Sequence, residues 1–128
     1  MYPRYKFLTL LVFLFFFRGV LAQDCSILKN SSFTYRVAKN NVLVEFKDNE
    51  YIEYHLDKKY YIKSKIEWES DCEYNLVIKE VTLPNFPFKE GTKLHIIITQ
   101  VKGNRVYYTS SMQGRTWDGK MKKIRKKS

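Results

Sequence analysis

Acidic side chains gather around a tryptophan and a cysteine in the middle of the chain. They are Glu67, Glu69, Asp71 and Glu73, next to Trp68 and Cys72. Paired carboxylates can carry out acid/base catalysis or hold calcium. However, the four acids recur at every second position, so on an extended strand they share one face, and they lack the glycine-containing loop of an EF-hand. We interpret them as a solvated strand face, and an enzyme site for envelope polymers is the rival interpretation.

The other residue types that could support catalysis are scattered. His55 and His95, the only histidines, lie in separate strand-like segments, and a zinc site would need further ligands around them. Thr109, Ser110 and Ser111 have no nucleophile-elbow motif, and nucleophilic catalysis requires a positioned base and oxyanion donors. We therefore predict no catalytic residue, no metal site and no cofactor, in a protein that is not an enzyme.

The first 22 residues have the pattern of a signal peptide. Arg4 and Lys6 precede an apolar run over residues 7–17, and Ala22 offers a small side chain before a cleavage site. The run is too short for a stable transmembrane helix, which argues against the alternative of an uncleaved anchor. We predict export to the periplasm or the extracellular space, with no transmembrane segment after cleavage.

Cys25 and Cys72 are the only cysteines. In an oxidising compartment an even pair favours one disulfide, and the alternative is two free buried thiols. A bridge would close a loop of about fifty residues and stabilise the fold by roughly 4 kcal/mol in the chain-entropy account. Asp24, which precedes Cys25, is not the small residue that lipid attachment to that cysteine needs.

Positive charge is concentrated at the C-terminal end. The net charge of the chain is +10, and the three basic residues of the leader leave +7 after cleavage. Six of these charges come from Lys120, Lys122, Lys123, Arg125, Lys126 and Lys127. We predict a single β domain over residues 23–119 and a basic tail over 120–128. The tail could contact anionic lipid or phosphate, but it lacks the interleaved aromatic residues that favour nucleic acid, and a solvated terminus is the simpler interpretation.

Short alternating segments separated by turn residues fill the region between leader and tail. The predicted strands cover residues 33–37, 42–47, 51–56, 60–68, 72–79, 94–101, 105–112 and 117–124. Short connections enforce antiparallel neighbours. We predict an all-β, antiparallel meander of about eight short strands that forms a closed or nearly closed small barrel, with a two-sheet sandwich as the alternative.

Local patterns add detail to this barrel. The segment Lys39-Asn40-Asn41 is predicted to be a turn, because asparagine tolerates positive φ. In the strand over 51–56, the apolar face predicted from the alternation carries Ile52, Tyr54 and Leu56, opposite Glu53 and His55. Phe86 and Phe88 lie in a proline-containing loop, where they either cap the barrel mouth or fold back over the core.

The segment Trp68-Glu69-Ser70-Asp71-Cys72-Glu73-Tyr74 resembles a Trp-x-x-Asp-Cys-Glu-Tyr signature of small exported bacterial proteins of unknown function. Proteins of this group often carry the name DNA topoisomerase IV. The chain does not support that name, because it is too short for a nucleotide-binding fold and has an export signal. It also departs from the pattern, with Asn30-Ser31-Ser32 where many members have a glycine after the first cysteine.

These observations favour an exported, non-enzymatic β domain that binds something. The partner is either a small apolar ligand in the barrel, since eight strands can enclose one, or an envelope or protein surface. A structural module docked through the basic tail to an anionic surface is a further alternative. An empty apolar space inside the sheet would distinguish ligand binding from the other interpretations.

Overall fold

The structure, a computed structural model, describes residues 24–125, so the predicted signal peptide and residues 126–128 lie outside the described part. It contains one 3-10 helix, η2 (Ser26–Leu28), and eight strands. The strands are β1 (Ser32–Val37), β2 (Asn40–Lys47), β3 (Glu50–His55), β4 (Tyr60–Ser70), β5 (Glu73–Val81), β6 (Lys93–Lys102), β7 (Arg105–Met112) and β8 (Arg115–Lys123). Each strand pairs antiparallel with the next and β8 pairs with β1, which confirms the predicted meander barrel.

The register of the sheet decides which side chains enter the barrel. Val44 of β2 stands opposite Glu53 of β3, which stands opposite Ile62 of β4. Residues paired in this way point to the same face, and Val44 and Ile62 are 0% and 3% exposed. β3 therefore turns Glu53 inward, with Tyr51 on the same face, and leaves Ile52 on the outside. The alternation had predicted the reverse.

The turn between β1 and β2 also differs from the prediction. It lies at Ala38–Lys39, while Asn40 and Asn41 belong to β2 and pair with Val37 and Arg36. Ala38 itself adopts a positive φ of 55°. The prediction relied on the turn preference of asparagine, which the continuous β1–β2 pairing overrides here.

The N-terminal segment fills one end of the barrel. Leu28 of η2 is fully buried, together with Phe33 and Phe46, whose rings meet edge to face at 5.7 Å. The predicted disulfide is confirmed: Cys25, next to η2, is joined to Cys72 in the β4–β5 turn, 47 positions further along the chain. The disulfide therefore holds η2 against this end of the barrel. In the chain-entropy account it raises the free energy of unfolding by roughly 4 kcal/mol.

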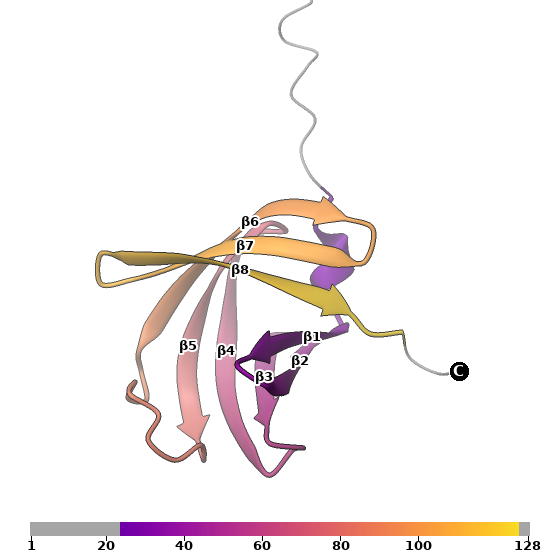
Figure 1. Cartoon of the computed structure of the whole chain (residues 1–128). Helices are drawn as coiled ribbons and strands as arrows, with labels where there is room; N and C mark the ends of the chain where they lie inside the picture. The colour runs from indigo at the N-terminus through magenta and orange to yellow at the C-terminus, as the bar shows by residue number, and fades with distance from the viewer. Residues whose placement is uncertain (1–23, 126–128) are drawn as a thin grey trace, which may run out of the picture.

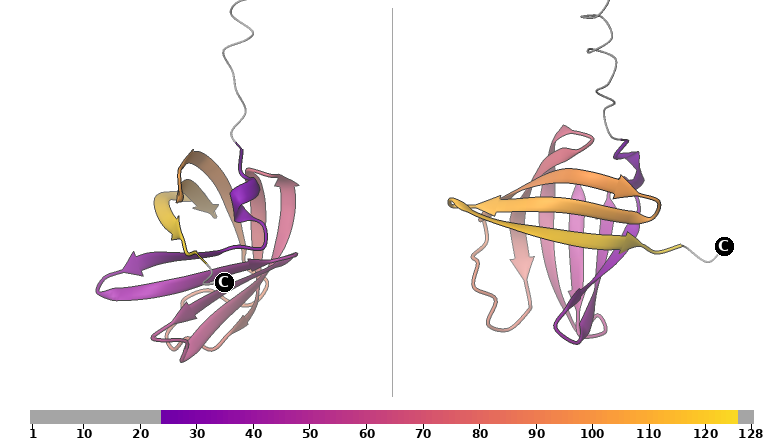
Figure 2. Two further views of the ribbon diagram at one scale, coloured as in Figure 1. Left: turned by 90° about the vertical axis from the view of Figure 1, so that its right-hand side faces the viewer. Right: turned by 45° about the horizontal axis from the view of Figure 1, so that its top comes forward.

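β8 closes the barrel through a short seam. Lys120, Lys122 and Lys123, assigned above to the tail, belong to this strand. β8 pairs with β7 from Arg115 to Lys122. With β1 it pairs only through Phe33–Lys123 and Thr34–Lys122 within residues 24–125, next to a hydrogen bond from the Ile124 N–H to the Ser32 carbonyl. Figures 1 and 2 show β6, β7 and β8 crossing the other strands steeply, with β8 approaching β1 near its C-terminal end. Beyond the seam the two strands diverge.

Over residues 24–125 the structure contains no helix of the length and apolar character that crossing a bilayer requires.

Candidate functional site

A cavity of about 780 Å³ lies within the barrel. Its apolar wall is built from alternate residues of β4, β5, β6 and β8: Ile62, Leu76, Ile78, Leu94, Ile96 and Met121. Pockets of roughly 300–1,000 Å³ are the size in which proteins commonly hold small molecules. The predicted sheet therefore encloses a space of the right size for such a ligand.

A carboxylate sits in the wall of this cavity. Glu53 lines it from β3, and its Oε1 accepts hydrogen bonds from the Tyr35 hydroxyl at 2.5 Å and the Tyr51 hydroxyl at 2.9 Å. The Glu53 side chain is 17% exposed to solvent. A buried carboxylate is costly without hydrogen bonds, and these two donors from β1 and β3 offset part of that cost.

Four tyrosine hydroxyls surround Glu53, and all four keep their protons in the neutral pH range. Burial raises the pKa of Tyr35, Tyr51 and Tyr74 far above the ordinary tyrosine value, and the negative charge of Glu53 raises it further. Burial raises the pKa of Tyr108 to about 12, with Glu53 again the second cause. Tyr35 and Tyr51 are therefore neutral hydrogen-bond donors to Glu53, and Tyr74 and Tyr108 are neutral tyrosines in the same cavity lining.

The second oxygen of Glu53 is arranged differently from the first. Its Oε2 lies 3.7 Å from Nε2 of His55, an ion-pair distance when His55 is protonated, but too long for a hydrogen bond. This Nε2 atom is buried and has no hydrogen-bond partner among residues 24–125. The Tyr35 and Tyr51 bonds both go to Oε1, so Oε2 is the acceptor that remains for a further group.

The cavity reaches the surface where β1 and β8 diverge. Its lining there includes the exposed basic residues Arg36, Arg105, Lys120 and Lys122. Trp117 of β8 also lines the cavity and is 41% exposed. Charged side chains and an aromatic side chain thus flank the opening of this cavity.

The two phenylalanines of the β5–β6 loop lie at the same cavity. Phe86 and Phe88 both contribute to its lining and meet edge to face at 5.4 Å. Ser110 lines the wall from β7 and is buried, whereas its neighbour Thr109 donates to Asp118 at 2.7 Å. None of these contacts forms a nucleophile–base pair.

A glycine in β8 makes room for one of the cavity tyrosines. Gly119 pairs with Tyr108 of β7, and a Cβ atom at Gly119 would lie 2.5 Å from the Tyr108 ring. The ring can therefore lie flat across β8 only because position 119 lacks a side chain. The Tyr108 hydroxyl also lies over this position, 2.6 Å from such a Cβ atom.

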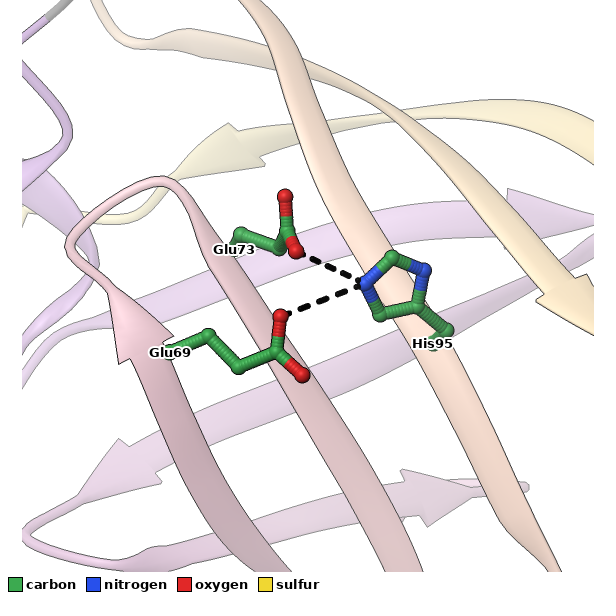
Figure 3. Close-up of side chains that lie close together, drawn as sticks. All are labelled: Glu69, Glu73 and His95. Atoms are coloured by element: carbon green, nitrogen blue, oxygen red, sulfur yellow. Dashed lines mark hydrogen bonds and ion pairs between the residues drawn. The ribbon is translucent and has the colours of Figure 1, made fainter.

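A second cluster lies on the outer surface of the barrel (Figure 3). His95 Nε2 of β6 is 3.1 Å from Glu73 Oε2 and 3.8 Å from Glu69 Oε2, and Asn75 donates to Glu69 at 3.1 Å. One ligand atom from each of Glu69, Glu73 and His95 lies within 4.8 Å of the others. These are types of group that bind metals, but they are substantially exposed and already pair with one another.

The other acids of the predicted cluster point elsewhere. Glu67 pairs with Lys93 at 3.1 Å, and Asp71 pairs with Lys29 at 3.0 Å. The Lys29 ammonium also lies over the Trp68 ring, 5.6 Å from its centroid. The four acids around Trp68 therefore pair with several different partners on the outer surface, and they do not all converge on one point.

Comparisons with protein families, with curated proteins and with solved structures found no match for this chain. The fold and the site therefore define it as a small, disulfide-linked, eight-stranded antiparallel barrel with an internal cavity.

Proposed function

We propose that the protein is exported and that it holds a small, mostly apolar ligand inside its barrel. The observation that carries the proposal is the cavity of about 780 Å³, whose wall is built largely from aliphatic and aromatic side chains. A folded core normally fills such a space with its own side chains. An apolar cavity that opens to the surface is instead the usual form of a small-molecule site.

Export is supported by two independent features. The chain begins with a leader pattern over residues 1–22, and Cys25 and Cys72 form a disulfide, which persists mainly in oxidising compartments. N-terminal sequencing of the secreted or periplasmic protein tests this part. A product that retains Met1 would contradict cleavage of the leader.

Ligand binding can be tested by filling the cavity. Leu94 lines the wall from β6, and Leu94→Trp adds bulk inside it; Ile97→Trp places the same bulk on the outer face of the same strand. The uncharged fluorescent probe N-phenyl-1-naphthylamine should bind the wild-type protein and the Ile97→Trp variant alike. Its affinity for Leu94→Trp should fall by about tenfold or more, because the introduced indole ring and the probe would occupy the same part of the cavity.

Two results would overturn the proposal. One is a wild-type protein that does not bind the probe in a concentration series; the other is equal binding by the Leu94→Trp and Ile97→Trp variants, which would place the probe outside the cavity. Urea unfolding of both variants checks that each remains folded at the temperature of the titration.

A further inference from the structure

We propose that the ligand carries a protonated amine, and that this amine binds to the Oε2 atom of Glu53 inside the barrel. The inference rests on the proposed ligand-binding function and names the chemical class of the ligand. It follows from the position of the Glu53 carboxylate in the cavity wall, from the tyrosines around it and from the exposure to water of the basic residues at the opening.

Glu53 places a carboxylate among apolar neighbours. It lies between Val44 and Ile62, both of which are almost fully buried, so an apolar residue would fit the sheet better at this position. Its Oε1 already accepts from Tyr35 and Tyr51. Its Oε2 lies 3.7 Å from the His55 ring nitrogen, which is an ion-pair distance when His55 is protonated but too long for a hydrogen bond.

An ammonium group suits the Oε2 atom of Glu53 better than a neutral donor does. It brings the opposite charge to a carboxylate in a low-dielectric site, where the attraction is much stronger than in water. The rings of Tyr35, Tyr51, Tyr74 and Tyr108 line the same cavity, and a cation is attracted to the face of such rings. Carboxylate and aromatic rings together form a site for an organic cation with an apolar body.

The basic residues at the opening favour a negatively charged headgroup, but their effect on a bound ligand is weaker than that of Glu53. Arg36, Lys120 and Lys122 line the opening and are exposed to water, so salt and solvent screen their effect on a bound group. Glu53 is largely shielded from both. The interior carboxylate should therefore decide which headgroup binds, while the opening sets a modest barrier to entry.

Isothermal titration calorimetry with octylamine, 1-octanol and octanoate tests the proposal, because the three probes share a chain and differ in headgroup charge. The wild-type protein at neutral pH should bind octylamine at least about tenfold more tightly than 1-octanol. Glu53→Gln should remove this preference while 1-octanol still binds, which shows that the cavity is intact. Glu45→Gln, the same change on the outer face of the neighbouring strand β2, should keep the preference.

Each other outcome overturns the inference. Equal affinities for octylamine and 1-octanol, or a preference that survives in Glu53→Gln, would show that Glu53 does not bind the headgroup. Tightest binding of octanoate would assign the headgroup to the basic opening. In these cases 1-octanol still binds and the proposed cavity function stands, whereas failure of all three probes overturns both proposals.

Discussion

Two sets of carboxylate and imidazole groups lie on opposite faces of the same sheet. Inside the barrel, Glu53 and His55 stand on β3 among tyrosine hydroxyls, and the Glu53 side chain is 17% exposed. Outside it, His95 bridges Glu69 and Glu73, and the Glu69 side chain is 49% exposed. The residue types are the same, but only the inner set is held away from water.

The difference shows how burial changes the value of a hydrogen bond. Glu69, Glu73 and His95 can replace their contacts with one another by hydrogen bonds to water at little cost, so their pairing adds little to the free energy of unfolding. The inner carboxylate depends more on its tyrosine donors, because a side chain that is 17% exposed has less access to water. The acidic cluster that the sequence makes evident therefore lies in contact with water, while the less conspicuous Glu53 is largely buried.

Raising the pH should produce the largest effect, and it should come from the inner set. The folded-state pKa values of Tyr35, Tyr51 and Tyr74 lie above those of an unfolded chain. Their stabilising contribution is complete below about pH 10 and is lost above it, since the unfolded state then releases protons that the folded state keeps. Each tyrosine should lower the free energy of unfolding by about 1.4 kcal/mol per pH unit above pH 10.

Urea unfolding between pH 8 and pH 11.5 measures this loss, and recovery after return to pH 8 separates it from chemical damage to the disulfide. An unfolding free energy that stays constant up to pH 11 would contradict the buried, protonated state of these tyrosines.

A matched pair of tyrosine variants should give an intermediate effect. Tyr51 donates to Glu53 inside the barrel, and Tyr61 donates to Glu80 on the exposed surface. Tyr51→Phe leaves a buried carboxylate with one donor fewer, so it should destabilise the protein by about 1–3 kcal/mol. Tyr61→Phe should cause no measurable change in the urea midpoint. Equal effects of the two variants would remove the distinction between the inner and the outer set.

The smallest effect should come from the outer cluster at low pH. Hydrogen bonding with Glu69 and with His95 lowers the pKa of Glu73. A lowered folded-state pKa gives a contribution that is present above the ordinary glutamate value and is lost as the pH falls through the folded-state pKa. An NMR titration should show the pKa of Glu73 moving upward in His95→Ala. Lys93→Ala, which removes a neighbouring cation paired with Glu67, should leave it in place, and a shift of similar size in both variants would refute the His95 assignment.

The orientation of Glu53 could have been deduced from a local signal. Asp48-Asn49 reads as a two-residue turn, and such a turn pairs Lys47 with Glu50 across a hairpin. Counting back from that pair brings Phe46 opposite Tyr51 and Val44 opposite Glu53, as the structure has them. Hydrophobic alternation alone favoured Ile52, because β3 offers two faces of similar apolar character and alternation does not include the neighbouring strands.

The sequence by itself determined the elements and the crosslink. Side-chain alternation repeats at a period of two in segments such as Tyr60 to Trp68, and this period depends only on local backbone geometry. Two cysteines allow one intramolecular pairing, and the predicted leader favoured that bridge over two free thiols; the structure contains it.

Only the tertiary structure decided which polar side chains line the cavity. Tyr35, Glu53 and Tyr108 come from β1, β3 and β7, and they face one cavity because the sheet curves until β8 meets β1. The short β1–β8 seam, which leaves the cavity open, depends on the stagger of all eight strands around the barrel. Closure and stagger are properties of the whole sheet, so no single segment of the sequence encodes them.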